Sequence, residues 1–432
     1  MKEIQTEVLI IGAGLAGVSA SLSAQAEGRE VLILAKDSGA SAMSSGALDF
    51  AGDPLAIPSK PEKWSLDQRK NLSEIIERLS HHPYGLLFSD AEQAFECLNQ
   101  ARRMVFGDGF LEGEEGKNIF AFNQLGTFKA TAWVQKGILK AKDLEGKKQA
   151  VLFYFKGLKN FDPEFFERNF LYWSQKLGAD LKLKKKEIVL EIKQEFSSLE
   201  FSRWAERNSE SLLEELVGLA KGKEADLILF PSLFSQALKE QIFRALEKES
   251  SAQVRELLAL PPSVPGKRLQ EFLTSRLEEG GIKRLKGKAL GFRADGRKVK
   301  AILARVGRDE IEISAQAIVL ATGSFLSGGI FKQGEFKEEI FGLKIFSSSQ
   351  ALGRIFTEKL TSKTITSPQA VFSVGIKVNE NLQPVDEQGR VVFENLFACG
   401  SILNGCNYIF DGTGAGTSLL TGLRAGKNAS NF

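Results

Sequence analysis

The residues best suited to do chemistry form a glycine-rich turn near the start of the chain. Gly12, Gly14 and Gly17 have the spacing of a dinucleotide-binding turn, with the apolar run 7–11 before them and the Ala- and Leu-rich segment 18–27 after them. Gly12 permits the tight turn, Gly14 lets the backbone approach a phosphate, and Gly17 lets a helix pack against the preceding strand. Amides at the start of that helix attract an anion. We therefore predict that a cofactor phosphate or pyrophosphate is bound by Gly12, Gly14, Leu15, Ala16 and Gly17.

A second apolar strand, 30–34, completes a βαβ unit. The next residues, Ala35 and Lys36, lie beside the cofactor, where dinucleotide sites usually carry an acid that binds ribose hydroxyls. Lysine cannot accept those hydrogen bonds. The ribose is therefore held by the backbone, by Ser38 or by Ser41, or it is absent. This departure leaves FMN and FAD both open, and it argues against NAD.

A loop of small residues, 38–49, follows the βαβ unit and contains almost no bulky side chain. Its backbone can approach a phosphate or a flat ring closely. The hydroxyls of Ser44 and Ser45 and the amide of Gly46 are suited to hydrogen-bond the edge of a flavin ring, where charge develops on reduction. The alternative is a flexible connector. The position of the loop favours cofactor contact.

Three segments near the carboxyl terminus repeat this design. Two short apolar strands, within 314–324 and 395–401, end in glycine, and small residues precede the apolar helix 418–425. That helix start is a second one suited to an anion. Many flavoproteins have Asp at the position of Ser401, so this chain departs from them at a ribityl contact. The order of the segments predicts an α/β, Rossmann-like FAD/NAD(P)-binding fold whose cofactor also contacts Ala321, Thr322, Gly323, Gly400, Ser401, Thr413 and Gly414.

Composition limits the function classes. A chain of 432 residues that is 43% hydrophobic is long enough for two lobes. The net charge of +3 is too balanced for a nucleic-acid-binding protein. Cys97, Cys399 and Cys406 have neither a metal-binding nor a disulfide spacing, so we expect no metal site and a reducing cytoplasm. The apolar runs have strand length and residues 1–7 do not resemble a secretory signal, so we expect membrane contact only through a partner.

The middle of the chain differs from both ends. Strands are expected within 150–155 and 225–231, an amphipathic helix within 161–177, and a solvated edge strand within 182–190. Prolines within 260–266 mark the return to the first domain. We therefore predict that residues 1–100 and 263–432 form the flavin-binding domain and that residues 101–262 form an inserted α/β cap, or substrate, domain.

Several segments together resemble a known family. They are the glycine turn, the loop 44–49, His82-Pro83-Tyr84, Leu125-Gly126-Thr127, Ala132-Trp133, Leu260-Pro261-Pro262-Ser263-Val264 and the segment 321–329. In this combination the chain resembles the B subunits of anaerobic glycerol-3-phosphate dehydrogenases over nearly its whole length. The resemblance implies quinone-linked oxidation of sn-glycerol 3-phosphate to dihydroxyacetone phosphate. It also implies a catalytic A subunit, an iron–sulfur C subunit that ties the pair to the inner face of the cell membrane, and FMN as the flavin. The glycine turn, usually a pyrophosphate site, favours FAD.

Catalysis is less defined by the sequence. Oxidation of a secondary alcohol needs a base for the hydroxyl proton, and His81 and His82 are the two histidines. His82 lies in a family-like segment, so it is the candidate base, with a phosphate contact or a packed structural histidine as the alternatives. The resemblance alone suggests that Lys129, Thr131 and Trp133 line the substrate pocket.

Two functional interpretations therefore remain. In the first, the protein binds the substrate and its flavin accepts the hydride. In the second, it is a non-catalytic partner whose flavin relays electrons between the other subunits, which the scarcity of histidine favours. A fumarate-reductase-like enzyme ranks last, because that chemistry needs histidine in the cap and residues 107–262 contain none.

Overall fold

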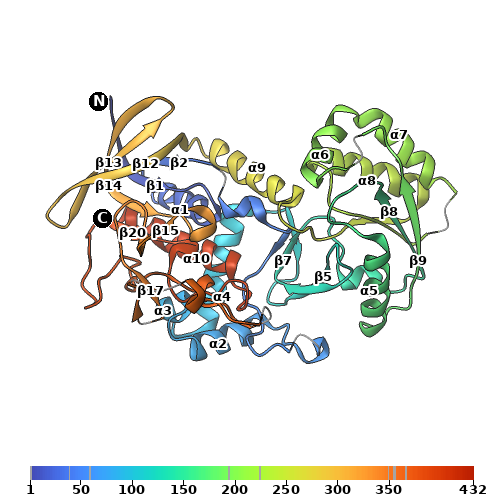
Figure 1. The fold of residues 1–432 in the computed structure, drawn as a ribbon, viewed down its shortest axis with the longest axis horizontal. Coiled ribbons are helices and arrows are strands. Elements are labelled where there is room, and N and C mark those ends of the chain that lie inside the picture. The colour runs from blue at the N-terminus through green and yellow to red at the C-terminus, as the bar shows by residue number, and fades with distance from the viewer. Residues whose placement is uncertain are drawn as a thin grey trace. The chain divides into compact units, whose positions relative to one another are not determined.

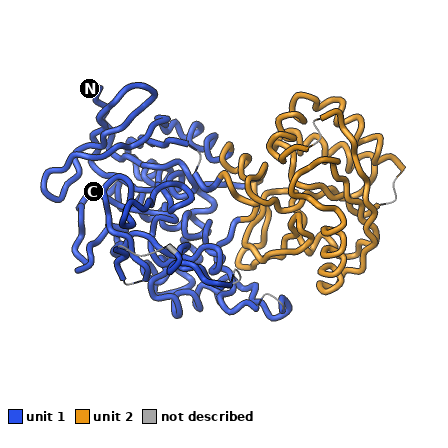
Figure 2. The backbone as a smooth tube through the Cα atoms, viewed as in Figure 1, with its two compact units in different colours: residues 1–41, 48–108, 272–432 blue, residues 42–47, 109–271 orange. Residues whose placement is uncertain are grey.

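The computed structural model describes residues 2–37, 39–57, 60–192, 195–222, 225–348, 350–353, 357–364 and 367–432. They belong to two compact units (Figure 2). Unit 1 comprises residues 1–41, 48–108 and 272–432, and unit 2 comprises residues 42–47 and 109–271. The chain therefore changes unit after residues 108 and 271, and the short segment 42–47 belongs to unit 2.

Unit 1 is built on a largely parallel sheet (Figure 1). Strand β1 lies between β2 and β14, β12 continues the parallel sheet beside β2, and β20 lies beside β14. Strand β13 runs antiparallel between β12 and β14. Residues 8–11 and 31–35 are buried throughout, as expected of parallel strands covered on both faces. The strands are β1 Lys2–Ile11, β2 Val31–Ala35, β12 Lys283–Asp295, β13 Lys298–Val306, β14 Asp309–Leu320 and β20 Leu396–Ala398.

Helices α1 (Leu15–Ala26) and α10 (Gly414–Ser430) pack directly against each other in unit 1. Their contact is partly polar, because the hydroxyls of Ser19 and Ser23 donate to the carbonyls of Leu419 and Leu423 at 2.7 and 2.8 Å. Small residues let the two backbones approach this closely. The remaining helices of unit 1 are α2 Gln68–Arg78, α3 Pro83–Leu87 and α4 Ala91–Phe106, and α9 Val264–Glu279 runs from unit 2 into unit 1.

Unit 2 contains a four-stranded parallel sheet in the order β11-β10-β8-β9. Alternate residues of β8 point to opposite faces, so Phe153 packs with α6, α7 and α8, whereas Leu152 packs with α5. The lysine-rich β9 is an edge strand, as predicted. The elements are β8 Gln149–Phe155, α5 Pro163–Lys176, β9 Lys182–Ile188, α6 Ser198–Arg207, α7 Ser209–Ala220, β10 Leu227–Phe230, α8 Gln236–Ser250 and β11 Gln253–Glu256.

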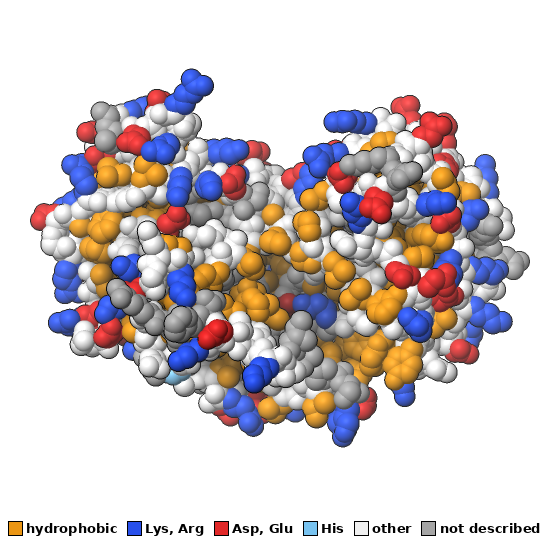
Figure 3. Space-filling view, viewed as in Figure 1, with side chains coloured by type: hydrophobic (Ala, Val, Ile, Leu, Met, Phe, Trp, Pro, Cys, Tyr) orange, Lys and Arg blue, Asp and Glu red, His pale blue; other side chains and the backbone are white. Residues whose placement is uncertain are grey.

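Short strands complete both units. They are β3 Ala47–Leu48, β4 Leu111–Gly113, β5 Ile119–Phe122, β6 Phe128–Thr131, β7 Trp133–Gln135, β15 Ile330–Gln333, β16 Glu335–Glu338, β17 Ile345–Ser347, β18 Gln350–Ala351 and β19 Gly375–Ile376. None of the helices described is long and apolar enough to cross a membrane. On the face drawn in Figure 3, cationic and anionic side chains are interspersed, in agreement with the balanced net charge. The predicted fold class, a Rossmann-like α/β fold with an inserted α/β unit, is confirmed.

We expect Gly422→Ala to destabilise unit 1. A Cβ atom at Gly422 would lie 2.5 Å from the carbonyl oxygen of Ala16, so α1 and α10 would have to separate. Such overpacking costs ~1–3 kcal/mol, which urea unfolding can measure. In the control Gly218→Ala, the new Cβ atom on α7 meets nothing within 4 Å, and better helix propensity stabilises by roughly 0.5–1 kcal/mol. Equal effects of the two substitutions would contradict the tight α1–α10 contact.

Candidate functional site

The glycine turn is held by the sheet of unit 1. The amide of Gly12 donates to the carbonyl of Leu34 at 2.9 Å, and Gly12 adopts a φ of +119°. A Cβ atom at Gly12 would lie 2.3 Å from the carbonyl oxygen of Ala321, and one at Gly17 would lie 2.0 Å from that of Gly12. Both glycines are therefore required by protein packing, independently of a ligand.

Gly14 is different, because a Cβ atom there would make only ordinary contacts, the nearest 3.5 Å from Ser41 Oγ. Gly14 caps the amino terminus of α1 without a side-chain hydrogen bond, and this fully described helix has no acidic residue in its first turn. First-turn amides have no acceptor within their own helix. Ser41 Oγ accepts from the amide of Leu15 at 2.9 Å, while Ser38 lies outside the described residues. This open helix start fits the phosphate of a nucleotide cofactor.

The carboxyl-terminal segments meet the glycine turn within unit 1. A Cβ atom at Gly400, whose φ is +79°, would lie 2.7 Å from Cβ of Ala16. The amide of Gly400 donates to Thr421 Oγ1 at 2.9 Å. A Cβ atom at Gly323 would lie 3.4 Å from Ser401 Oγ. The structure thus brings together three of the segments that the sequence predicts to contact the cofactor.

Thr322 provides a second observation that fits a bound group. Its Oγ1 atom is buried and has no hydrogen-bond partner among the described residues. A Cβ atom at Gly329 would lie 1.9 Å from the carbonyl oxygen of Gly323 and 2.7 Å from this hydroxyl oxygen, so close packing of the two segments requires the glycine. A buried hydroxyl without a partner costs folding free energy unless a ligand or a water molecule forms a hydrogen bond with it.

His82 and Thr413 are linked in the core of unit 1. His82 is fully buried, its Nδ1 accepts from the amide of Tyr84 at 3.1 Å, and its Nε2 lies 3.1 Å from Thr413 Oγ1. Burial lowers the pKa of His82 to about 3, so the ring is neutral at neutral pH. Because Nδ1 accepts, Nε2 carries the proton and donates to Thr413. Both ring nitrogens are therefore engaged in holding α3 and the start of α10.

Burial also shifts the pKa values of neighbouring titratable groups. Burial raises the pKa of Asp411 to about 6, although its carboxylate accepts from the amide of Asn407 at 2.9 Å. Burial raises the pKa of the Cys406 thiol to about 11 and also raises that of Cys399. Both thiols stay protonated at neutral pH, which makes them poor nucleophiles. Sequence reasoning missed Thr421, whose hydroxyl accepts from the amide of Gly400, and Asp411, whose carboxylate is buried.

The other predicted site residues are dispersed. Ala35 is the buried end of β2 and Lys36 is exposed beyond it. The predicted flavin contacts Ser44, Ser45 and Gly46 lie in unit 2, where Gly46 accepts from the amide of Gln135 at 2.8 Å. Lys129, Thr131 and Trp133 also lie in unit 2, on β6 and β7. The roles of these residues stay predictions.

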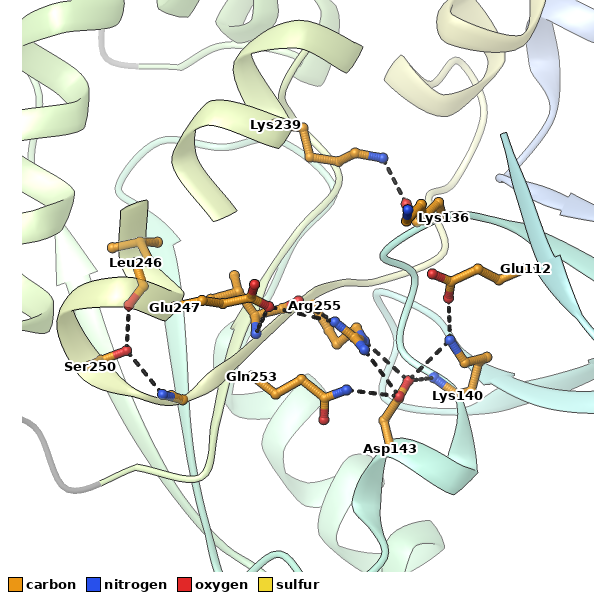
Figure 4. Close-up of polar contacts among 12 residues, drawn as sticks. Glu112, Lys136, Lys140, Asp143, Lys239, Leu246, Glu247, Ser250, Gln253 and Arg255 are labelled. Carbon is orange, nitrogen blue, oxygen red and sulfur yellow. Dashed lines mark hydrogen bonds and ion pairs between the residues drawn. The ribbon is translucent and has the colours of Figure 1, made fainter. Parts of the chain in front are cut away.

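A balanced polar cluster in unit 2 joins the segment 140–143 to β11 (Figure 4). Asp143 accepts from the amide of Lys140 at 2.8 Å and from Gln253 Nε2 at 3.1 Å, and it lies 3.3 Å from Arg255 Nε. Lys140 also pairs with Glu112. Because cations and carboxylates are matched, we assign this cluster a structural role.

A second cluster in unit 2 is fully buried. Glu256 accepts from Arg268 Nη2 at 2.6 Å and lies 3.5 Å from Lys239 Nζ. Burial is the main cause that lowers the pKa of Lys239 to about 8. Lys239 also donates to the carbonyl of Lys136 at 2.7 Å (Figure 4). Sequence reasoning missed these residues, because their contacts join three elements, α8, β11 and α9, that are separate in the sequence.

We expect Gly14→Val protein to fold but to lose its cofactor. The branched side chain would occupy the approach to the α1 amides, while the loss of a good N-cap costs only ~1 kcal/mol. Flavin absorbance per protein and the unfolding free energy of the cofactor-free protein measure the two effects separately. The control Gly291→Val, where a Cβ atom meets nothing within 4 Å, should keep its flavin. Full flavin content in Gly14→Val would refute the assignment of this turn.

We expect His82 to make the protein acid-labile. The pKa of His82 is about 3 in the folded protein and ordinarily 6.5. The buried, neutral ring therefore contributes fully to the free energy of unfolding above pH 6.5, and this contribution is lost as pH falls toward 3. The loss between pH 6.5 and about pH 4.5 is roughly 2–3 kcal/mol. His82→Asn keeps an acceptor for the amide of Tyr84, so urea unfolding of this variant should lack that part of the pH dependence. The exposed-site control His81→Asn should retain it, and equal slopes in both variants would count against burial of His82 as the cause.

The chain is similar to known proteins over nearly its whole length. It is 29% identical to the B subunit of the anaerobic glycerol-3-phosphate dehydrogenase of Actinobacillus pleuropneumoniae serotype 5b, covering 96% of this chain and 97% of that one. The protein of the same name from Pasteurella multocida is 26% identical, with 97% of each chain covered. These similarities confirm the resemblance found in the sequence. Among solved structures, the open conformation of a flavocytochrome c3 fumarate reductase has a TM-score of 0.45 at 11% identity, covering 99% of this chain and 78% of that one.

The family of the chain follows from a match that includes nearly all of it. Residues 7–417 match the family described as FAD binding domain. The match begins at β1 and ends within α10, so it includes the glycine turn and every carboxyl-terminal segment that approaches the turn. The chain therefore belongs to the FAD-binding-domain family and is a flavin-dependent oxidoreductase.

Proposed function

We propose that this chain is the flavoprotein B subunit of a quinone-linked anaerobic glycerol-3-phosphate dehydrogenase. The reaction is oxidation of sn-glycerol 3-phosphate to dihydroxyacetone phosphate, with electrons passed to a membrane-linked iron–sulfur partner. The observation that carries the proposal is the open helix start at Gly14, in a chain similar over almost its whole length to proteins of that name. The partners in this proposal are a catalytic A subunit and an iron–sulfur C subunit, and the complex lies at the inner face of the cell membrane.

The residues of unit 1 would hold the flavin by its phosphate. A flavin bound there supplies a two-electron acceptor for oxidation of an alcohol. The amides of Gly14, Ala16 and Gly17, at the start of α1, would donate to this phosphate. Thr322 supplies a hydroxyl whose hydrogen bond the protein leaves incomplete, and Ser401 lies beside Gly323. In this proposal Lys129, Thr131 and Trp133 contact the substrate.

The identity of the flavin rests on two arguments that point in different directions. The resemblance to B subunits implies FMN, and the absence of an acid at Ala35 and Lys36 agrees with it. The glycine turn and the match to the FAD-binding-domain family favour FAD, which we propose. The mass of the flavin released from purified protein decides between them, because FAD is heavier than FMN by an AMP moiety.

The surroundings of His82 favour electron relay as the second candidate function. A base must accept the hydroxyl proton of the substrate, and both nitrogens of His82 are engaged with Tyr84 and Thr413. His82 thus acts as a base only if it releases these contacts. In the relay interpretation the chemistry belongs to the A subunit, and this chain carries electrons onward from it.

The two functions can be separated by anaerobic reduction of the flavin. The purified chain is mixed with sn-glycerol 3-phosphate, with glycerol as the control substrate, and the visible flavin band is followed. Bleaching by the phosphate ester alone is expected if the chain oxidises it directly. Bleaching only after the A subunit is added is expected for the relay. A flavin that stays oxidised in both mixtures would refute the proposed function.

A further inference from the structure

Tyr408 lies between two of the segments that are predicted to contact the flavin. It belongs to the segment that precedes α10, and its side chain is only partly buried. A Cβ atom at Gly414, in the first turn of α10, would lie 3.2 Å from Tyr408 Cβ and 3.9 Å from Cγ and Cδ2 of its ring. The ring of Tyr408 therefore packs beside the start of that helix.

The hydroxyl of Tyr408 reaches the second of these segments. It forms a hydrogen bond with the side chain of Ser324, which directly follows the predicted flavin contacts 321–323. Ser324 is itself buried. Tyr408 thus joins the end of β14 to the start of α10, although the two segments lie far apart in the sequence.

The phenol of Tyr408 is neutral at neutral pH. Burial is the main cause that raises the pKa of Tyr408, the proximity of Cys406 adds to this rise, and the hydrogen bond with Ser324 opposes it. A phenol with a raised pKa is a poor base, so Tyr408 is not suited to accept the hydroxyl proton of a substrate. Its ring instead offers a flat aromatic face beside a hydrogen-bonding hydroxyl.

The protein does not enclose the ring of Tyr408 as it would enclose a core residue. One edge meets the ring of Phe372, with the centroids 5.7 Å apart and the planes at 67°. The next two residues, Ile409 and Phe410, are 61% and 48% exposed. Large apolar side chains exposed beside a predicted cofactor segment are typical of a ligand site.

The ligand that fits this position is the flat ring system of the flavin, against which an aromatic side chain can pack. We propose that Tyr408 contacts the flavin ring. This inference rests on the flavin site proposed at Gly14 and Thr322. It holds whether the chain oxidises the substrate itself or relays electrons.

The test is the fluorescence of the flavin bound to the full chain. A tyrosine in contact with an excited flavin gives it one electron, which then returns, so emission is lost without net oxidation. Phenylalanine does not give that electron, so Tyr408→Phe should raise the fluorescence per bound flavin severalfold. Tyr408→Leu removes the aromatic ring and should also weaken flavin binding by about two- to tenfold.

Two control variants separate contact with the flavin from a structural role of Tyr408. Ser324→Ala removes the same hydrogen bond but keeps the tyrosine ring, so the fluorescence per bound flavin should stay at the native value. Tyr172→Phe makes the same substitution at an exposed position of α5 in unit 2, and it should also leave the fluorescence unchanged.

Three results would overturn the proposal. The first is native fluorescence per bound flavin in Tyr408→Phe, and the second is native flavin affinity in Tyr408→Leu. The third is an equal rise of fluorescence in Ser324→Ala, which would show that the link between β14 and α10 controls the emission. Flavin content is measured in every sample. A native protein that binds no flavin would refute the flavin site itself, so the two failures are distinguished.

Discussion

The close approach of α1 to its neighbours is the constraint on which unit 1 depends. Gly17 places the first turn of α1 against the backbone of Gly12, and Gly422 and Gly426 of α10 lie against the carbonyls of Ala16 and Ala20. In each case a Cβ atom would lie 2.5 Å or less from a backbone oxygen. Because α1 cannot shift without breaking these contacts, its amino terminus is fixed relative to the sheet. An anion site made of backbone amides needs this rigidity, since amides that move solvate a charge poorly.

The same packing separates two kinds of glycine. Gly12 and Gly17 are required by the protein, whereas Gly14 has space around it that the protein does not use. The sequence pattern does not distinguish the three glycines. In the structure, only Gly14 is not required by protein packing and can be explained by ligand binding alone. Thr322 repeats the distinction at the end of the neighbouring strand β14, where its buried hydroxyl has no hydrogen-bond partner among the described residues. The candidate site in unit 1 is thus indicated by polar groups that lack partners within the described part of the protein, namely first-turn amides of α1 and the hydroxyl of Thr322.

Local features of the sequence were sufficient for the fold, because strands and helix starts are specified by neighbours in the chain. Local sequence patterns predicted β1 from its apolar run and α1 from the glycine turn and the small residues that follow it. The lysines of β9 likewise indicated an edge strand. The site was less predictable. The burial of His82 and its contact with Thr413 join residues 331 positions apart, and the Glu256 cluster joins three elements. Such contacts depend on tertiary packing, which no local pattern encodes.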